Sequence, residues 1–295
     1  MKIRISAAVA VLASVAAAAL LIPPADAPAP SGRPGVVAPI ETVAVAGGRF
    51  QYRVPGEFLR NGRVIKGPTV EKQIRRPVEV MKYQVSVAEY AACVADGACQ
   101  PADTRASGDV PVTGVSYRDA VVYAAWLSDR TGEDWRLPSD EEWAFVAAER
   151  FGDDATGIGD DDGSNPAARW IAAYRYRADP RERDMEPKPR GHFGVNSNGL
   201  ADLSGNVWEW TDTCYARNRV DAAGRLAEAT TNCGVRIIGG QHRGYMSNFL
   251  RDGKSGGCAA GMAPPDNLGF RLVRDPAPAI GVALLRRIVG PEARG

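Results

Sequence analysis

The chain has 295 residues, with 36 Lys and Arg against 35 Asp and Glu, so its formal net charge is +1. A near-neutral chain lacks the basic excess that neutralises phosphates, and its arginines are scattered among acidic residues, so no nucleic acid partner is expected. The length allows one large domain or two small ones. One domain is favoured, because no linker interrupts the region that carries the motifs.

The N-terminus has the form of an export signal. Lys2 and Arg4 precede an uninterrupted, weakly apolar run over residues 5–22, and the triplet at 25–27 has the small-x-small form of a cleavage site. We therefore expect a signal peptide over residues 1–27 and a periplasmic or otherwise extracytoplasmic protein. An uncleaved membrane anchor is the alternative, because the run is just long enough to span a bilayer.

Three further segments follow the signal. A linker rich in Pro and Ala over residues 28–42 leads into one domain over residues 43–275, and residues 276–295 form a C-terminal tail. A membrane is expected as a partner only if the N-terminal segment stays uncleaved.

Three segments share a serine followed three residues later by an acid, which is the pattern of a helix N-cap with a capping box. The pairs are Ser86 with Glu89, Ser116 with Asp119, and Ser139 with Glu142. We expect a helix to begin at each serine and the second helix to end near residues 131–132. Alternation of apolar and polar residues over 77–85 predicts a half-buried strand before the first helix.

Five cysteines in an exported chain indicate disulfides, and the odd number leaves at least one thiol over. Cys93 and Cys99 flank a short loop with a turn-forming Asp-Gly, so we predict a bridge between them. Among the other three at most one bridge can form, and we predict Cys214 with Cys233, across a polar excursion of the chain. Cys258 then remains as the odd thiol, either reactive or buried and inert.

Residues 198–210 combine oxygen ligands, a tight glycine turn and two tryptophans. Asp202 and Glu209 offer carboxylates, and the backbone carbonyls around Gly205 and Val207 can complete the oxygen-only shell that calcium prefers. The segment therefore predicts a structural calcium site. The alternative is an Asp-capped turn that leads into a short strand, with the two tryptophans in the core.

The motif at 198–210 resembles, almost letter for letter, a signature of the formylglycine-generating enzyme family, the sulfatase-modifying-factor domain. Blocks at 111–116, 136–143 and 267–273 resemble three other family motifs and stand in the family's order. The resemblance implies an α+β fold, a loop-rich variant of the C-type-lectin fold with few helices and short strands. It also implies that the four candidate calcium ligands have that role.

The chain departs from the family where the oxidase binds copper. The active enzymes use a pair of cysteines after a Gly-Gly-Ser-aromatic strand, whereas this chain has no cysteine over residues 239–252. In the family's register Ser247 and Asp252 replace the two thiols, and Cys258 lies just beyond. Soft thiolates suit copper(I), so we expect neither copper nor formylglycine-generating oxidase activity.

The same segment holds the remaining polar candidates. With only two histidines, the chain cannot build a multi-histidine iron or zinc centre by itself. No catalytic residue is assigned, and the candidates are His242, Ser247, Asp252 and Cys258. A groove for a peptide or an anion is predicted from His242, Arg243, Tyr245, Asn248 and Arg251. An ordinary hydrogen-bonded surface strand is the alternative.

The resemblance and the missing thiols together favour an exported accessory or maturation factor that binds another exported protein or a peptide segment. Cysteine-poor bacterial members of the family include proteins encoded beside copper nitrite reductases, so the resemblance implies a partner context near denitrification. One alternative is an oxidoreductase of the family that modifies a protein cysteine or a small molecule, with Cys258 or a metal held by His242 and Asp252. The other alternative is a lectin-like binding module.

Overall fold

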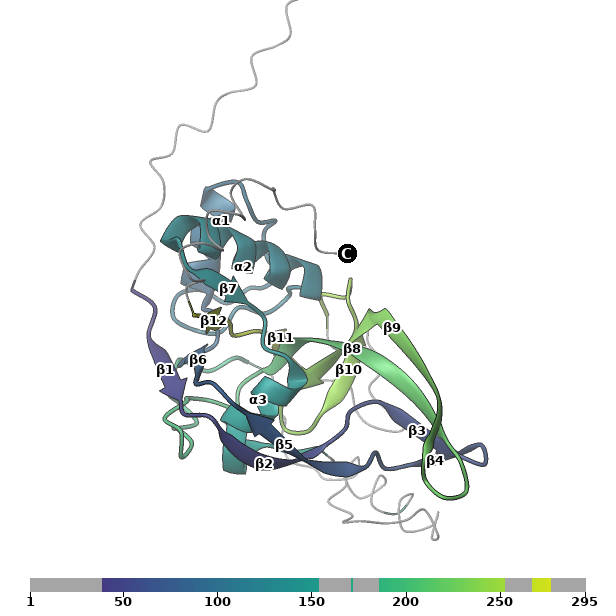
Figure 1. Cartoon of the computed structure of the whole chain (residues 1–295). Coiled ribbons are helices and arrows are strands. Elements are labelled where there is room, and N and C mark those ends of the chain that lie inside the picture. Colours follow the sequence, from purple (N-terminus) through teal and green to yellow (C-terminus); the bar gives the residue numbers. More distant parts are fainter. Residues whose placement is uncertain (1–38, 154–170, 172–185, 253–266, 277–295) are drawn as a thin grey trace, which may run out of the picture. The chain divides into compact units, whose positions relative to one another are not determined.

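Three α-helices combine with β-sheets of four, six and two strands in the described part of the chain (Figure 1). The computed structural model describes residues 39–153, 171, 186–252 and 267–276. The predicted signal peptide, most of the linker, Cys258 and almost all of the tail lie outside these residues. No helix within the described ranges is both long and apolar enough to cross a membrane.

The helices are α1 (Val87–Ala95), α2 (Tyr117–Thr131) and α3 (Asp140–Ala147), and a short 3-10 helix, η1 (Ala148–Arg150), follows α3. The three predicted capping boxes are confirmed. Ser86, Ser116 and Ser139 each accept from the backbone N–H three residues on, and the acid at that position accepts from the serine N–H. The predicted end of the second helix is also confirmed, because Gly132 caps α2 at a φ of 72°.

The sheets bring together segments that are far apart in the sequence. The four-stranded sheet has the order β1 (Thr42–Val45), β6 (Val78–Met81), β12 (Val273–Asp275) and β7 (Asp134–Arg136). The six-stranded sheet has the order β10 (Gly244–Ser247), β9 (Leu226–Gly239), β8 (Trp208–Val220), β3 (Glu57–Arg60) and β4 (Arg63–Ile65), with β11 (Leu268–Gly269) parallel to β8. The third sheet pairs β2 (Gly48–Arg53) with β5 (Thr69–Ile74).

The predicted strand over 77–85 is shorter than expected, since β6 ends at Met81. Beyond it the chain pairs with segments that are not strands. The N–H of Val85 donates to the carbonyl of Phe270, and its carbonyl accepts from Val112, both at 2.9 Å or less. These contacts draw residues 84–85 into the core, where Val85 is fully buried, so the regular alternation ends early.

Both predicted disulfides are confirmed. Cys93 and Cys99 are bridged with their Cα atoms 5.3 Å apart, and Cys214 and Cys233 with theirs 4.5 Å apart. The first bridge closes the loop after α1, and the second ties β8 to β9. Every cysteine that the structure describes is therefore oxidised in a pair.

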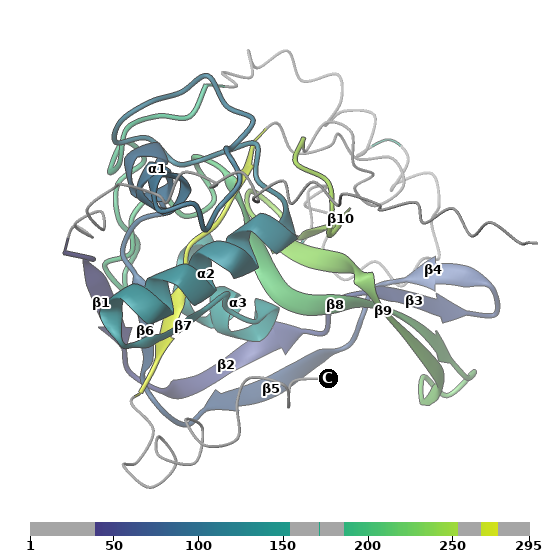
Figure 2. The ribbon, with the colours of Figure 1, turned by 90° about the horizontal axis from the view of Figure 1, so that it is seen from above.

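Two hydrophobic clusters form the core. The larger lies around α1 and α2 and contains Trp208 and Trp210, and the smaller lies around α3 and contains Trp143 and Leu203. The two tryptophans of the 198–210 motif are thus core residues. The long β8–β9 hairpin extends away from the helices in both views (Figures 1 and 2).

The capping of α2 gives a first test. Replacing Ser116 by Ala removes the side-chain acceptor of the Asp119 N–H, and we expect the free energy of unfolding to fall by about 1 kcal/mol. Urea denaturation followed by circular dichroism measures this loss. The exposed Ser107→Ala variant is the control, and an equal loss in both variants would contradict the capping role.

Candidate functional site

Asp202 organises the turn at the start of the 198–210 motif. Its carboxylate is buried and accepts from the backbone N–H groups of Gly191 at 2.6 Å and Phe193 at 2.8 Å. Its own backbone lies in the left-handed region, at a φ of 60°, and its carbonyl accepts from the Gly205 N–H. The side chain therefore compensates an unfavourable backbone conformation by joining two segments of the loop.

Glu209 and Arg271 form an ion pair that has no solvent exposure on either side chain. The pair is bidentate, with Nε 2.7 Å from Oε2 and Nη2 2.8 Å from Oε1. Gln84 Nε2 donates to Oε1 at 2.8 Å, and Trp143 Nε1 donates to Oε2 at 2.9 Å. Four donors thus surround the Glu209 carboxylate.

The N–H groups of Arg271 that do not contact Glu209 also donate hydrogen bonds. Nη1 donates to the carbonyls of Met81 and Lys82 at 3.2 and 3.0 Å, and Nη2 donates to the carbonyl of Ala201 at 2.9 Å. Arg271 therefore joins the end of β6, the 198–210 loop and β8 at one buried point. Such a pair is tolerated inside a protein because hydrogen bonds satisfy both charged groups.

These contacts bear on the predicted calcium site. The carboxylate of Glu209 contacts the guanidinium of Arg271, and that of Asp202 accepts from two backbone N–H groups. Donors within the protein therefore already bind the two carboxylates that a calcium ion would need. Within the described ranges, no group of three or more His, Cys, Asp or Glu side chains could hold a metal. Calcium binding by Asp202, Gly205, Val207 and Glu209 stays a prediction, and the ion must compete with these donors.

The segment 239–252 begins at the end of β9 and contains β10. An added Cβ would lie 2.7 Å from the Trp143 ring at Gly239 and 2.5 Å from the Trp208 ring at Gly240. Side chains at these two positions would clash with the core. The two tryptophans therefore set the path by which the chain leaves β9 and enters the segment that carries the candidate site.

The side chains of His242 and Arg243 are largely buried. His242 is 3% exposed, and its Nδ1 lies 2.9 Å from the carbonyl of Arg243. Arg243 contacts both carboxylate oxygens of Asp140, at 3.1 and 2.8 Å, and the Tyr52 hydroxyl donates to the same carboxylate at 2.7 Å. Burial and then Asp140 raise the pKa of Tyr52 well above its usual value, so the phenol remains a donor.

Tyr245, Ser247 and Asn248 are partly exposed at and after β10. The ring of Tyr245 lies 4.9 Å from that of Tyr215, which gives this region an aromatic pair. Asn248 has a structural use, because its N–H and its side-chain amide donate to two carbonyls of β9 at 2.8 and 3.2 Å. Asn248 itself lies in the turn after β10 and is hydrogen-bonded to the neighbouring strand.

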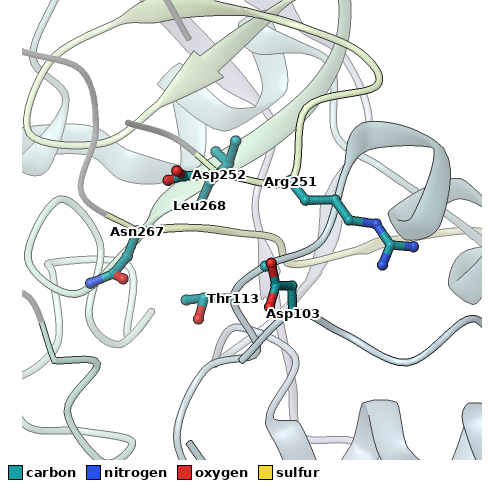
Figure 3. A pocket seen from close by; sticks show the side chains of 7 residues that line it. Asp103, Thr113, Arg251, Asp252, Asn267 and Leu268 are labelled. Carbon is teal, nitrogen blue, oxygen red and sulfur yellow. The ribbon is translucent and has the colours of Figure 1, made fainter. Parts of the chain in front are cut away.

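Arg251 and Asp252 lie at a pocket of about 160 Å³ next to β11 (Figure 3). The pocket is lined by Asp103, Thr113, Gly114, Arg251, Asp252, Asn267 and Leu268. The guanidinium of Arg251 points away from Asp252 and donates to Asp119 at 2.7 Å and to the Pro101 carbonyl at 3.0 Å. Of the predicted candidates, Asp252 and Arg251 are therefore at the pocket, and Ser247 does not line it.

Among the described residues that line this pocket, the side chains offer oxygen and no sulfur. Asp103 and Asp252 supply carboxylates, Thr113 supplies a hydroxyl and Asn267 an amide (Figure 3). Copper(I) prefers soft thiolate ligands, so the described lining does not fit that ion. The pocket instead presents acceptors, which suit a ligand with N–H donors or positive charge.

Sequence reasoning missed Arg271 as the partner of Glu209 and missed Asp103, Thr113 and Asn267 as pocket residues. An arginine among apolar residues is a usable signal, because a buried charge must be paired. Thr113 and Asn267 stand inside two of the four blocks that carry the resemblance. Asp103 carries no local pattern that separates it from a surface residue.

Comparison with known proteins agrees with this geometry. The model of the sulfatase-modifying factor enzyme 1-like domain family matches residues 30–276. A formylglycine-generating enzyme from Mycobacterium tuberculosis is 40% identical over 116 residues, which cover 38% of this chain and 36% of that protein. The inactive C-alpha-formylglycine-generating enzyme 2 of Mus musculus is 30% identical over 164 residues, 55% of this chain and 48% of that protein. The chain thus matches less than half the length of either relative.

Solved structures agree on the fold. PvdO from Pseudomonas aeruginosa superposes with a TM-score of 0.51 over 83% of this chain and 100% of that one, at 22% identity. At this identity the likeness concerns the fold alone. The expected α+β, loop-rich fold of the formylglycine-generating enzyme type is confirmed.

The buried ion pair gives a second test. Glu209→Gln leaves the charge of Arg271 uncompensated in the core, so we expect the free energy of unfolding to fall by about 3–5 kcal/mol. Urea denaturation in calcium and in EGTA measures the loss, and an equal loss in both conditions assigns it to the ion pair with Arg271. Glu57→Gln, which breaks the exposed pair with Arg217, is the control and should cost at most about 1 kcal/mol. If EGTA lowers the free energy of unfolding of the wild type as much as Glu209→Gln does, the effect belongs to calcium.

Proposed function

Since the chain belongs to the sulfatase-modifying factor enzyme 1-like domain family, we propose that it is an accessory or maturation factor that binds another exported protein. In this proposal the chain lacks the oxidase chemistry of the active relatives. The partner segment is held at the pocket beside β11, and the protein acts outside the cytoplasm.

One observation carries the proposal: the described lining of the pocket beside β11 supplies oxygen atoms. The resemblance to the family implies that Asp252 takes the position of the second thiol. Asp252 lies at the pocket, where Asp103, Thr113 and Asn267 add further oxygen atoms. The four cysteines within the described ranges are all in disulfides. Copper(I) has no thiolate pair to bind here, whereas a donor-rich peptide has several acceptors.

The comparisons with known proteins and the disulfides support an exported protein that is not an oxidase. One relative, at 30% identity, is named as an inactive formylglycine-generating enzyme, so a chain with this fold need not be an oxidase. Disulfides support export, because they persist in oxidising compartments. A partner near copper nitrite reductase and denitrification stays a prediction of the resemblance alone.

The metal content of the purified protein distinguishes the proposed binding protein from an oxidoreductase. We expect protein isolated from the periplasm without chelators to hold no copper or iron at one atom per chain, and to form no aldehyde on a cysteine peptide after loading with copper. Elemental analysis and mass spectrometry of the peptide measure both. Copper or iron near one per chain, lost in Cys258→Ala or His242→Ala but kept in the control His192→Ala, would establish the oxidoreductase alternative instead.

Site-specific crosslinking tests the binding surface. Phe249 precedes the pocket residue Arg251 by two positions and is 63% exposed, so a photoreactive phenylalanine fits there without repacking. We expect one discrete crosslinked product in the periplasm of the native host. The matched control is Val64 on β4, which is 50% exposed and lies at the opposite edge of the six-stranded sheet. No product at Phe249, or equal products at both positions, would contradict a partner site beside the pocket.

A further inference from the structure

The outer edge of β9 is only partly covered. β9 contains 14 residues, but β10 pairs with no more than Val235–Ile238. Asn248 then donates to the carbonyls of Cys233 and Gly234. Within the described ranges no strand pairs with the outer edge of β9 over residues 226–232.

This edge is exposed to solvent, and its strand is hydrogen-bonded to β8 on the inner side. Every residue from 226 to 234 is exposed, and the hairpin projects from the helical part of the molecule (Figure 2). The strand is nevertheless held on its inner side, because β8 pairs with it along its length and β3 pairs with β8. The Cys214–Cys233 disulfide fastens the base of the hairpin.

The edge lacks the features that usually prevent strand addition. Exposed edges are commonly protected by lysines, prolines or bulges, since their N–H and C=O groups can pair with another strand. Register irregularities in the β8–β9 pairing lie on both sides of residues 228–232, near the turn between Arg219 and Val220 and at the base of the hairpin around Cys214, and the pairing of 228–232 between them is regular. The regular edge that follows, residues 228–232, reads Glu-Ala-Thr-Thr-Asn and has a single charge, at Glu228.

The sequence of this edge is complementary to itself. Antiparallel pairing of two copies along the whole of 228–232 has one register, centred on Thr230. It places Thr230 opposite Thr230 of the second copy, a pair that stabilises sheets through hydroxyl hydrogen bonds. It also places Ala229 opposite Thr231. Because Glu228 is the only charged residue of 228–232 and does not face itself, no like charges are opposed.

The remaining pair in this register matches a donor with an acceptor. Glu228 faces Asn232 of the second copy on both sides of the axis. The side-chain oxygen of Asn232 accepts from the Gly234 N–H at 2.9 Å, so its NH₂ group is the part that can donate to a carboxylate. Two such contacts flank the central threonine pair.

We propose that the 228–232 edge of β9 is a homodimer interface, in which two copies of this chain join their six-stranded sheets by antiparallel pairing about Thr230. The contact is isologous, as a two-fold axis requires, and it closes both edges so that no filament grows from them. The pocket beside β11 is not part of the interface, so dimerisation and the proposed partner binding are independent.

One isosteric substitution tests the register. Asn232→Asp keeps the oxygen that accepts from Gly234 but places a carboxylate opposite Glu228 of the second copy, twice per dimer. We expect the dimer dissociation constant to rise by about tenfold, and by less at high salt. Sedimentation velocity over a dilution series of the full mature chain measures this constant.

Two further variants make the test specific. Thr231→Asp adds the same charge one position away, opposite Ala229, and should leave the dissociation constant of the wild type unchanged. Glu228→Gln in the Asn232→Asp background removes the facing carboxylates and should restore dimerisation. A wild-type chain that is monomeric at its solubility limit, or equal shifts for both aspartate variants, would overturn the proposal.

Discussion

The ion pair between Glu209 and Arg271 is the constraint on which the rest of the structure depends. Two charges without solvent exposure are costly unless every polar atom is matched, and here Gln84, Trp143 and three backbone carbonyls complete the match. The partners come from residues 81–84, from Trp143 and from Ala201 of the 198–210 motif, so the pair is satisfied only when these segments meet. This explains physically why blocks that are distant in sequence occur together: the 136–143, 198–210 and 267–273 blocks each contribute to this one contact.

The pair also links the core to the candidate site. Trp143 belongs to the cluster around α3 and Trp210 to the cluster around α1 and α2, with Glu209 between them. Trp143 and Trp208 press against the two glycines at the end of β9, so the core dictates how the chain enters β10. The buried carboxylate of Glu209 thus contacts Trp143, which in turn packs at the end of β9, ahead of the segment that reaches the pocket beside β11.

Local patterns in the sequence predicted the parts of the fold whose partners are close along the chain. The capping boxes at Ser86, Ser116 and Ser139 depend on residues three positions apart, and both disulfides close short loops or hairpins. Long-range pairing was not predictable in this way. The contact of Arg243 with Asp140 is an example, because the two residues lie 103 positions apart. The strand over 77–85 ended early for the same reason, since Val85 pairs with Val112 and with Phe270, which are 27 and 185 positions away.

The division between framework and side chains bears on how such a chain can change its activity. The buried network tolerates little variation, because loss of one partner leaves a charge unmatched. Ser247 and Asp252 are under no such demand, since neither is buried. Substitutions at these two positions are therefore expected to cost little free energy of folding. The fold alone does not fix the activity, because the residues that form the buried ion pair are different from those that line the pocket.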